Sequence, residues 1–595
     1  MRKIVYPVLF VIPIVIWAVI AYFTKVNLSP AFMSGAIFWG TFIIGELFIL
    51  GCILACEELT VVPPIVLAVV LVVIFIVGVV GGTDMFNANK AYEQLGEVEE
   101  TSFADSILPI DYTQIPTVDE DLALKQAEKK LGEERGLGSI VDIGKFTLQQ
   151  IDGELVFVAP LEHENFWKYL DNKTTSGYVT VSATDPDDVE LVQELDGNDI
   201  KLRYLNSASF GDNLTRHLRN SGFRTTGFTD MTFELDDDGR PYWTVTTYEN
   251  TAFWALPEAT GVIICDAQTG ETEFYSIEDT PEWVDKIQPE AFIEAQIDNY
   301  GKYEDGFLNT IFGKNGIIEM TPGVLTVYND GECYYYTGMT SVGNDDATTG
   351  FIMINTRTKE AKFFSLAGAT EASAQASAEG MLQEKGYSAT LPVPLNVQGI
   401  PTYFMTMKDK AGLIKSYAMV NIENYSIVAT GTTVAQVQQK YIDAVLTNGD
   451  TTVVGSEESY LYHVEGTVSR ISAEISNGNT TYYMIINDDH TKLYVASSSL
   501  SEELAITREG DNVKVSYLDD SNGTVNVAAF DNLDFTQEKS DDQERKDEQN
   551  ADKEGVAEDD TNNVIEVNPD EAEAEWDSLT DEEKAKLLEE SQEEE

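Results

Sequence analysis

The chain contains 595 residues, of which 101 are acidic and 38 basic, so its formal net charge is −63. Because binding to a nucleic-acid backbone depends on clusters of Lys and Arg, this composition argues against nucleic acid as a partner. Residues 85–535 are numerous enough for three or more domains.

Three long apolar segments fill the N-terminal region, approximately Ile4–Phe23, Ala31–Cys56 and Val62–Val80. A helix rises about 1.5 Å per residue, so ~20 apolar residues cross a hydrocarbon core of ~30 Å, and each segment is long enough to span it. No small-residue cleavage site follows the first segment and two more come directly after it, which indicates an uncleaved helix rather than a signal peptide. Residues 1–84 are therefore predicted to form a three-helix transmembrane anchor.

The charges around these segments predict the topology. Arg2 and Lys3 favour a cytoplasmic N-terminus, although Lys25 in the first loop acts weakly in the opposite sense. Three crossings then place everything after Gly82 outside the cytoplasm. We expect a multi-pass cell-membrane protein with a large extracytoplasmic body.

Glu46 is the single acidic residue within the apolar segments. A carboxylate near the middle of a membrane costs on the order of 2.5 kcal/mol or more, so it should face a partner or water. One interpretation is a contact with a proton, an ion or a partner helix. We favour the simpler one, a protonated carboxyl hydrogen-bonded inside the helix bundle.

The four cysteines fall into two pairs. Cys52 and Cys56 lie four residues apart in the second apolar segment, whereas Cys265 and Cys333 belong to the body. The second pair could be bridged outside the cytoplasm, but we favour buried free thiols. The absence of a C-x-x-C motif gives a zinc site or a thioredoxin-type site no support.

The body repeats a pattern four times. A turn glycine precedes an aromatic or β-branched strand at Gly153, Gly239, Gly331 and Gly399. In the first three cases an Asp precedes the glycine, a hairpin dipeptide in which glycine supplies the positive φ. Each strand is followed by a second strand pair with alternating apolar residues, as a sheet with one buried face requires.

A helical stretch precedes each of these strand sets. The clearest stretches are 119–134 and 370–385, and weaker ones cover 213–220 and 289–299. A helix followed by a small antiparallel sheet, repeated in tandem, predicts an α+β array. The expected boundaries of the four units are 85–208, 209–285, 286–368 and 369–445.

The second unit ends in a turn that reads Asp266-Ala-Gln-Thr-Gly-Glu271. Together with the preceding helix and D-G turn, this resembles the PepSY and YpeB-like modules of bacterial envelope proteins, with drifted versions at Asn355 and Asn421. Strings such as Pro281-Glu-Trp-Val-Asp285 resemble a family of uncharacterised bacterial multi-span membrane proteins over roughly residues 1–440. The resemblance implies an envelope location without an assigned activity, and by analogy a role in regulating peptidases or in envelope sensing.

The pattern changes to five short strands in residues 458–535, which predicts a small OB-like β-barrel. Tyr482, Tyr483 and Tyr494 could stack on bases, but acidic residues outnumber basic ones here, so we favour a barrel that packs against protein. Residues 536–595 are strongly acidic and almost free of aromatic residues, which predicts a disordered tail. Within it, residues 570–588 could form a transient amphipathic docking helix.

No catalytic signature emerges from the sequence. The four histidines, His163, His217, His463 and His490, do not form H-E-x-x-H, and neither G-x-S-x-G nor a P-loop is present. Acid clusters at 185–188 and 236–238 lack the spacing of a calcium loop, so we interpret them as hairpin turns. We predict no catalytic residue, no metal site and no cofactor.

Trp283 is the one aromatic residue that we single out in the body. Pro281-Glu282-Trp283 follows an expected strand and is predicted to open a helix, with Trp283 as a packing anchor. The alternative is an aromatic residue that stacks on a ligand.

These patterns predict a non-enzymatic scaffold or sensor of the cell envelope that acts through protein or peptide contacts. Exposed edge strands of the units could accept an added peptide strand. One alternative is a carboxylate-dependent envelope hydrolase, which needs convergent acids with at least one raised pKa. Another is an accessory subunit of a membrane complex, such as a transporter, that uses Glu46.

Overall fold

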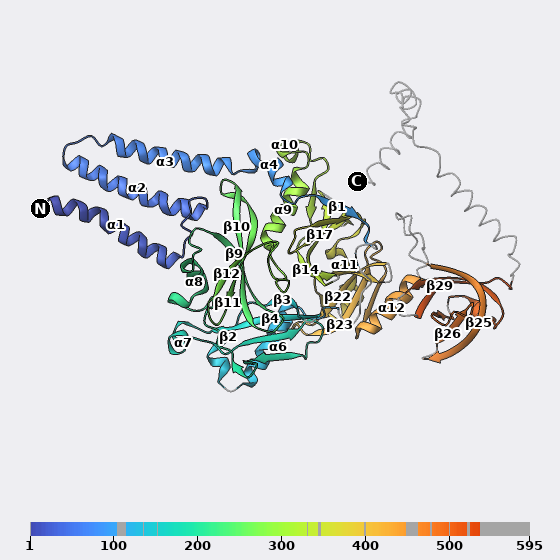
Figure 1. Ribbon diagram of the computed structural model, residues 1–595. Coiled ribbons are helices and arrows are strands. Elements are labelled where there is room, and N and C mark those ends of the chain that lie inside the picture. Colours follow the sequence, from blue (N-terminus) through green and yellow to red (C-terminus); the bar gives the residue numbers. More distant parts are fainter. Residues whose placement is uncertain are drawn as a thin grey trace, which may run out of the picture.

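The protein is a mixed α+β chain with apolar N-terminal helices and several β-sheets (Figure 1). The computed structural model describes residues 2–103, 107, 115–134, 136–151, 153–329, 331–342, 347–397, 400–447, 462–476, 479–498, 500–519 and 524–535. The expected acidic tail 536–595, with its amphipathic stretch 570–588, lies outside these residues.

Three antiparallel helices form the N-terminal part: α1 (Arg2–Thr24), α2 (Met33–Cys56) and α3 (Val62–Gly81). Of these, α2 and α3 are long and apolar enough to cross a membrane, and α1 contains a shorter apolar part, Val8–Thr24. Prolines stand in the first turn of α3, where a missing N–H leaves no hydrogen bond unmade.

The two connections between these helices lie at opposite ends of the bundle. At the body end, the N–H of Leu28 donates to the carbonyl of Arg224 (2.9 Å), and Asn27 Nδ2 donates to the carbonyl of Thr226 (3.0 Å). At the far end, the Tyr6 hydroxyl donates to the carboxylate of Glu57. The N-terminus therefore lies away from the body (Figure 1).

Four sheets, antiparallel except for one parallel edge strand described below, make up most of the body. The first contains β2 (Val141–Ile143), β3 (Thr147–Ile151), β4 (Glu154–His163), β5 (Tyr178–Ser182) and β6 (Val189–Val192). The second contains β9 (Gly227–Leu235), β10 (Pro241–Ala252), β11 (Ala255–Asp266) and β12 (Thr272–Ser276). The third contains β13 (Ile318–Met320), β14 (Leu325–Asn329), β15 (Glu332–Ser341), β17 (Gly350–Asn355) and β18 (Ala361–Phe364). The fourth contains β20 (Ser388–Ala389), β21 (Val393–Val397), β22 (Ile400–Lys408), β23 (Ile414–Asn421) and β24 (Val428–Gly431).

Three of the sheets share one arrangement. In each, a long strand (β4, β15 or β22) pairs along its first half with the strand before it and at its end with a short extra strand (β2, β13 or β20). In the second sheet a single strand, β9, pairs along one side of β10, with a register shift at Val245/Thr246, while β11 pairs along the other side. The glycines that open three of the long strands, Gly153, Gly239 and Gly331, have φ values of 83°, 77° and 76°, which confirms the predicted turns.

Helices begin close to the predicted positions: α6 (Glu120–Glu133), α8 (Leu214–Asn220), α9 (Glu290–Tyr303) and α11 (Glu371–Met381). Asp119 caps α6, because its Oδ1 accepts the N–H of Leu122 (3.0 Å). Thr370 caps α11 in the same way through the N–H of Ser373 (3.2 Å).

The helix predicted to open at Pro281 does not form, since residues 281–289 contain only turns and loops before α9 begins at Glu290. The guanidinium of Arg357 donates to the carbonyls of Thr280 and Pro281, at 2.9 Å each. A side chain therefore satisfies carbonyl groups that a helix would have bonded to its own N–H groups.

One segment lies elsewhere than the predicted boundaries suggest. Residues 85–101 were expected in the first unit, but α4 (Asp84–Glu93) packs on α9, and β1 (Val98–Thr101) pairs in parallel with β18. Tyr92 stacks on Tyr300, with ring centroids 5.4 Å apart. Without β1, strand β18 would be the open edge of the third sheet. Strand β1 covers this edge, although nothing in the residues around β1 in the sequence indicates the pairing.

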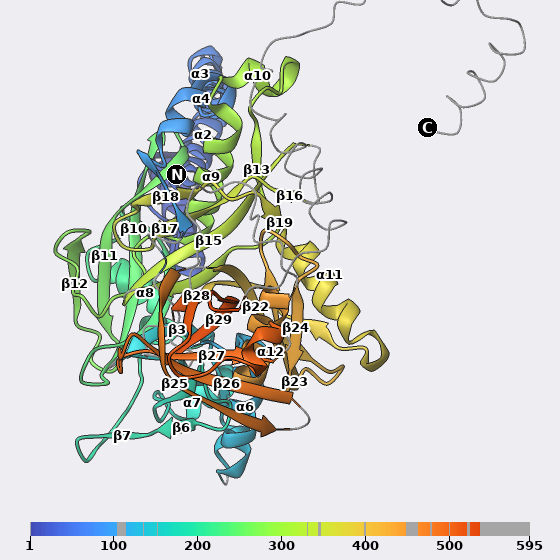
Figure 2. The same cartoon turned by 90° about the vertical axis from the view of Figure 1, so that its right-hand side faces the viewer.

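The strands after α12 (Val434–Thr447) close into a barrel in the order β25-β26-β27-β29-β28 (Figure 2). Its strands are β25 (Tyr462–Ser476), β26 (Asn479–Ile486), β27 (Leu493–Ser497), β28 (Asn512–Asp519) and β29 (Thr524–Asn532). Tyr494 is 3% exposed and packs against Tyr517, so it belongs to the barrel core and is not free to stack on a base.

Both cysteines of the body are free and buried, as favoured from the sequence. Cys265 lies in the core shared by the first two sheets, together with Phe233 and Trp243. The third and fourth sheets share a second core around Tyr336, Phe351 and Tyr403.

Candidate functional site

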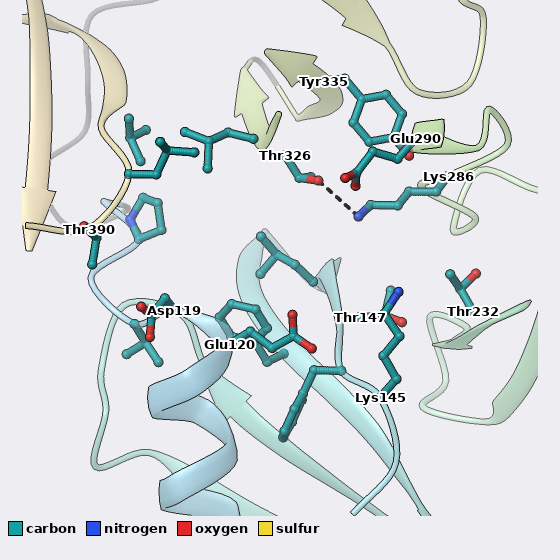
Figure 3. Close-up of a pocket in the computed structure, with 18 of the residues that line it drawn as sticks. Asp119, Glu120, Lys145, Thr147, Thr232, Lys286, Glu290, Thr326, Tyr335 and Thr390 are labelled. Atoms are coloured by element: carbon teal, nitrogen blue, oxygen red, sulfur yellow. Dashed lines mark hydrogen bonds between the residues drawn. The ribbon is translucent and has the colours of Figure 1, made fainter. Parts of the chain in front are cut away.

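A cavity of about 620 Å³ lies where the four sheets meet (Figure 3). The start of α6 and strand β3 line it from the first sheet, and β9 lines it from the second. The start of α9 and parts of β14 and β15 come from the third, and residues around Thr390 and β22 from the fourth. We call this space the central cavity. Since every sheet supplies part of its wall, it exists only when the four are assembled.

The central cavity is rich in charge. Two lysines, Lys145 and Lys286, and five acids line it: Asp119, Glu120, Asp230, Glu290 and Glu294. Lys286 Nζ donates to Thr326 Oγ1 at 3.1 Å (Figure 3). The excess of acids makes the cavity favourable for a ligand with a positively charged group.

Glu290 has the most perturbed carboxyl among the acids of the central cavity wall. Burial raises its pKa, and the nearby negative charges of Glu294 and Asp230 act in the same direction, while Lys286 and Lys145 lower it. In contrast, Asp119 has a fixed structural partner, since its carboxylate forms an ion pair with Lys408 of the fourth sheet. Asp119 is therefore less available to bind a ligand than Glu290.

A second carboxyl, Glu234, lies inside the protein behind the cavity wall. It is 0% exposed, and its Oε1 accepts hydrogen bonds from Thr232 Oγ1 (2.9 Å) and Thr244 Oγ1 (2.8 Å). Burial, reinforced by the charge of Asp285, raises its pKa to about 7. Its Oε2 finds no hydrogen-bond partner within the described part of the chain. Thr232 also lines the cavity, so this carboxyl is one side chain away from it.

Asp285 joins the first and third sheets beside Glu234. Its Oδ2 accepts the N–H of Gln150 (2.9 Å) and the hydroxyl of Tyr328 (3.0 Å). Burial raises its pKa despite these hydrogen bonds. Gln149 makes the corresponding link to the second sheet, because its side-chain amide bonds both the carbonyl (2.6 Å) and the N–H (3.0 Å) of Leu235.

Neither of the two residues singled out from the sequence, Glu46 and Trp283, lines the central cavity. Glu46 lies on α2, and both its carboxylate oxygens are buried without a hydrogen-bond partner among the described residues, so the favoured hydrogen-bonded arrangement is not found. Trp283 packs against Tyr242, with ring centroids 5.2 Å apart, and lies beside Val284 and Ile287. It does not line the central cavity, so its position is that of a packing residue.

The acid clusters form turns, as interpreted from the sequence. Asp236 Oδ1 accepts the N–H groups of Asp238 (3.0 Å) and Arg240 (2.8 Å), and Asp185 Oδ1 accepts that of Asp187 (3.0 Å). Within the described ranges, no group of three or more His, Cys, Asp or Glu side chains is arranged to hold a metal ion.

Sequence reasoning missed Lys145, Lys286, Glu290 and Glu234. Lys286 and Glu290 lie just before and at the start of α9, but Lys145 precedes β3, and only the assembled sheets bring it close to them. Glu234 carried a local signal, an acid flanked by Phe233 and Leu235 in a strand. Alternation assigns such a residue to the polar face of a sheet, but here both faces are covered.

No family model matches this chain, and no curated protein matches it either. Among solved structures, it is similar to a variant of B. megaterium levansucrase, with 11% identity over 71% of this chain and 97% of that one. The TM-score of 0.17 is too low to carry an argument about fold or function.

Proposed function

We propose that this protein is a membrane-anchored, non-enzymatic binding protein of the cell envelope whose central cavity receives a peptide or protein segment. The central cavity carries this proposal, because four sheets converge on it with an excess of acidic side chains. A basic side chain or amino group of the bound segment would be attracted to Glu290 and its acidic neighbours.

The helical bundle supports an anchor of three spans. Helix α1 has 23 residues and packs beside α2, and the contacts at Leu28 and at Glu57 lie at opposite ends of the bundle. Three crossings then separate the N-terminus from the body. With Arg2 and Lys3 on the cytoplasmic side, the body is extracytoplasmic.

The shared strand arrangement supports four PepSY-like units in tandem. Each consists of a helix and an antiparallel meander, and three of them repeat the short extra strand at the end of the long one. The barrel order β25-β26-β27-β29-β28 supports an OB-like module, and the burial of Tyr494 favours packing against protein over nucleic acid.

Strand β9 supports the peptide part of the proposal. It lies at the edge of its sheet and lines the central cavity through Thr229, Asp230 and Thr232. Gln149 already caps this edge at Leu235 with both of its amide groups. An edge strand that faces a cavity is suited to pair with an added peptide strand.

The test is site-specific photo-cross-linking in intact cells, with the photoreactive residue at Leu391 inside the central cavity. The matched control carries it at Tyr425, which is 53% exposed and does not line the cavity. We expect a cross-linked polypeptide from Leu391 only, and weaker cross-linking in a Glu290→Gln background. Products from Tyr425 alone, or none that contain a polypeptide, would contradict peptide binding. Protease treatment of intact cells and of spheroplasts tests the location of the body.

Two alternatives rest on specific observations. The raised pKa of Glu290 beside Asp230 and Glu294 is compatible with a carboxylate-dependent envelope hydrolase. Hydrolysis of envelope polymers by the purified protein, abolished by Glu290→Gln, would replace our proposal. The carboxyl of Glu46, which has no hydrogen-bond partner among the described residues, is compatible with an accessory subunit of a membrane complex. A Glu46→Gln variant that retains full function would remove that alternative.

A further inference from the structure

A crevice of about 300 Å³ lies between the body end of α1 and helix α8. One wall consists of Ala18, Ala21 and Tyr22 from the last turns of α1. The opposite wall comes from α8 and the turn that follows it, and Figure 1 shows α8 beside this end of α1. We call this space the interfacial crevice.

Four cations gather around the interfacial crevice: Lys25, Arg216, Arg219 and Arg224. None of the described residues that line it is acidic. In the part of the chain that the structure describes, none of the four takes part in an ion pair. Such a gathering is unexpected in a chain of net charge −63, and like charges this close repel one another unless an anion lies between them.

Two of these cations are fixed in place but retain unused hydrogen-bonding capacity. Arg219 Nη1 donates to the carbonyls of Phe223 (2.7 Å) and Thr226 (2.6 Å), and the guanidinium of Arg216 lies 4.4 Å from the ring centroid of Tyr22. The Nε atoms of both arginines are buried and have no hydrogen-bond partner among the described residues. Preorganised donors and positive charge without a carboxylate are the features of an anion site.

The interfacial crevice lies at the level where α1 would leave a membrane. Helix α1 ends at Thr24, and the two preceding residues, Tyr22 and Phe23, are 44% and 68% exposed. Phe210, whose carbonyl accepts a hydrogen bond from Arg216, is also exposed. Exposed aromatic residues around the end of a spanning helix are typical of the membrane–water interface.

We propose that the interfacial crevice binds the headgroup phosphate of an anionic phospholipid. The four cations surround the headgroup phosphate, and the acyl chains extend along the apolar wall of α1. This assignment rests on the membrane-spanning role proposed above for α1. It goes beyond that proposal because it gives the body a lipid ligand of its own, bound independently of the central cavity.

The test is native mass spectrometry of the full-length, delipidated protein in a non-ionic detergent, titrated with phosphatidylglycerol or phosphatidylcholine. The double variant Lys25→Gln/Arg224→Gln removes two cations, and it leaves Arg216 and Arg219 in their hydrogen bonds to the backbone. Since each cation near an anionic lipid strengthens binding about fivefold, we expect the double variant to bind phosphatidylglycerol about 25-fold more weakly. Binding of phosphatidylcholine should be weak and unchanged.

A double variant at two cations outside the crevice, Lys201→Gln/Arg240→Gln, is the matched control and should retain wild-type affinity for phosphatidylglycerol. Equal affinity for both lipids, or equal losses in the two double variants, would overturn the assignment. Displacement of phosphatidylglycerol by millimolar inorganic phosphate would also overturn it and would identify a site for a soluble phosphate. Release of the protein from membranes by alkaline carbonate would instead contradict the anchor, so the two failures are distinguishable.

Discussion

Charged side chains gather in both the central cavity and the interfacial crevice, but the two are built in opposite ways. The central cavity collects acids but also contains their counter-charges, Lys145 and Lys286, and Lys408 binds Asp119 directly. The interfacial crevice collects cations without a described acid. A ligand of the central cavity must therefore compete with internal partners, whereas an anion in the crevice would supply the missing partner. A site whose charges already have internal counter-charges is suited to a ligand that exchanges. A site without internal counter-charges is suited to a ligand that stays bound.

The contrast between the two regions would be misleading if the arginines of the interfacial crevice only stabilised the fold. We expect Arg219→Gln to destabilise the protein by about 4 kcal/mol, since two charge-assisted hydrogen bonds to the carbonyls of Phe223 and Thr226 are lost. Arg224→Gln should cost no more than about 0.5 kcal/mol, because Arg224 is exposed and its hydrogen bonds are long, at 3.3 and 3.4 Å. Thermal unfolding in detergent measures both.

Equal destabilisation by these two substitutions would mean that the whole cluster is structural. A loss of lipid binding in Arg224→Gln at unchanged stability would separate a ligand contact from a framework residue. The Arg219 variant therefore tests the structural role of the crevice residues, and the Arg224 variant tests their role in lipid binding.

The elements that the sequence predicted well are those with local signals. Gly153, Gly239 and Gly331 marked their turns because each needs a positive φ, and Asp119 marked the start of α6 because it caps the helix. The pairing of β1 with β18 was not predictable in this way, since 260 or more residues separate the partners and four-residue strands carry little pattern. The expected helix at Pro281 failed for the same reason, because Arg357 holds that segment from 70 or more residues away.

The candidate site was less predictable than the fold. The central cavity unites residues from four sheets, and neither their spacing nor their chemistry differs from that of surface residues elsewhere in so acidic a chain. The interfacial crevice does have a local signal in the sequence. Arg216, Arg219 and Arg224 occur within nine residues and without an acid among them, unlike most of this sequence. Only the position of α8 beside Tyr22 shows what that run of cations faces.

The stability of the region around the central cavity should depend on pH. The folded-state pKa of Glu234 is about 7, above its ordinary value of 4.5, so folding favours its protonated form. The resulting stabilisation is complete below about pH 4.5 and is lost as the pH rises through 7, by about 3 kcal/mol in total. Glu234→Gln is neutral at every pH and should lack this loss. We expect it to unfold several degrees above the wild type at pH 8 and close to it at pH 5.

Measurement of the melting temperature of both proteins between pH 5 and pH 8 isolates this carboxyl, because the other titrating groups contribute to both curves. Parallel curves would show that Glu234 ionises without a stability cost. In that case the buried side of the central cavity would tolerate an ionised group as well as the interfacial crevice does, and the contrast between the two regions would disappear.

The smallest effect that we expect concerns what raises the pKa of Glu234. After burial, the charge of Asp285 is the largest contribution that raises the pKa of Glu234. Asp285→Asn removes this charge and keeps an oxygen that can accept the hydrogen bonds from Gln150 and Tyr328. We expect the pH at which stability is lost to fall by less than about one unit, which corresponds to about 1 kcal/mol. The measurement is the difference in melting temperature between Asp285→Asn and Asp285→Asn/Glu234→Gln across the same pH range. Asp187→Asn, in an exposed turn, is the control and should leave the midpoint unchanged. An unchanged midpoint in Asp285→Asn would assign the whole shift to burial, and the two carboxyls would then titrate independently.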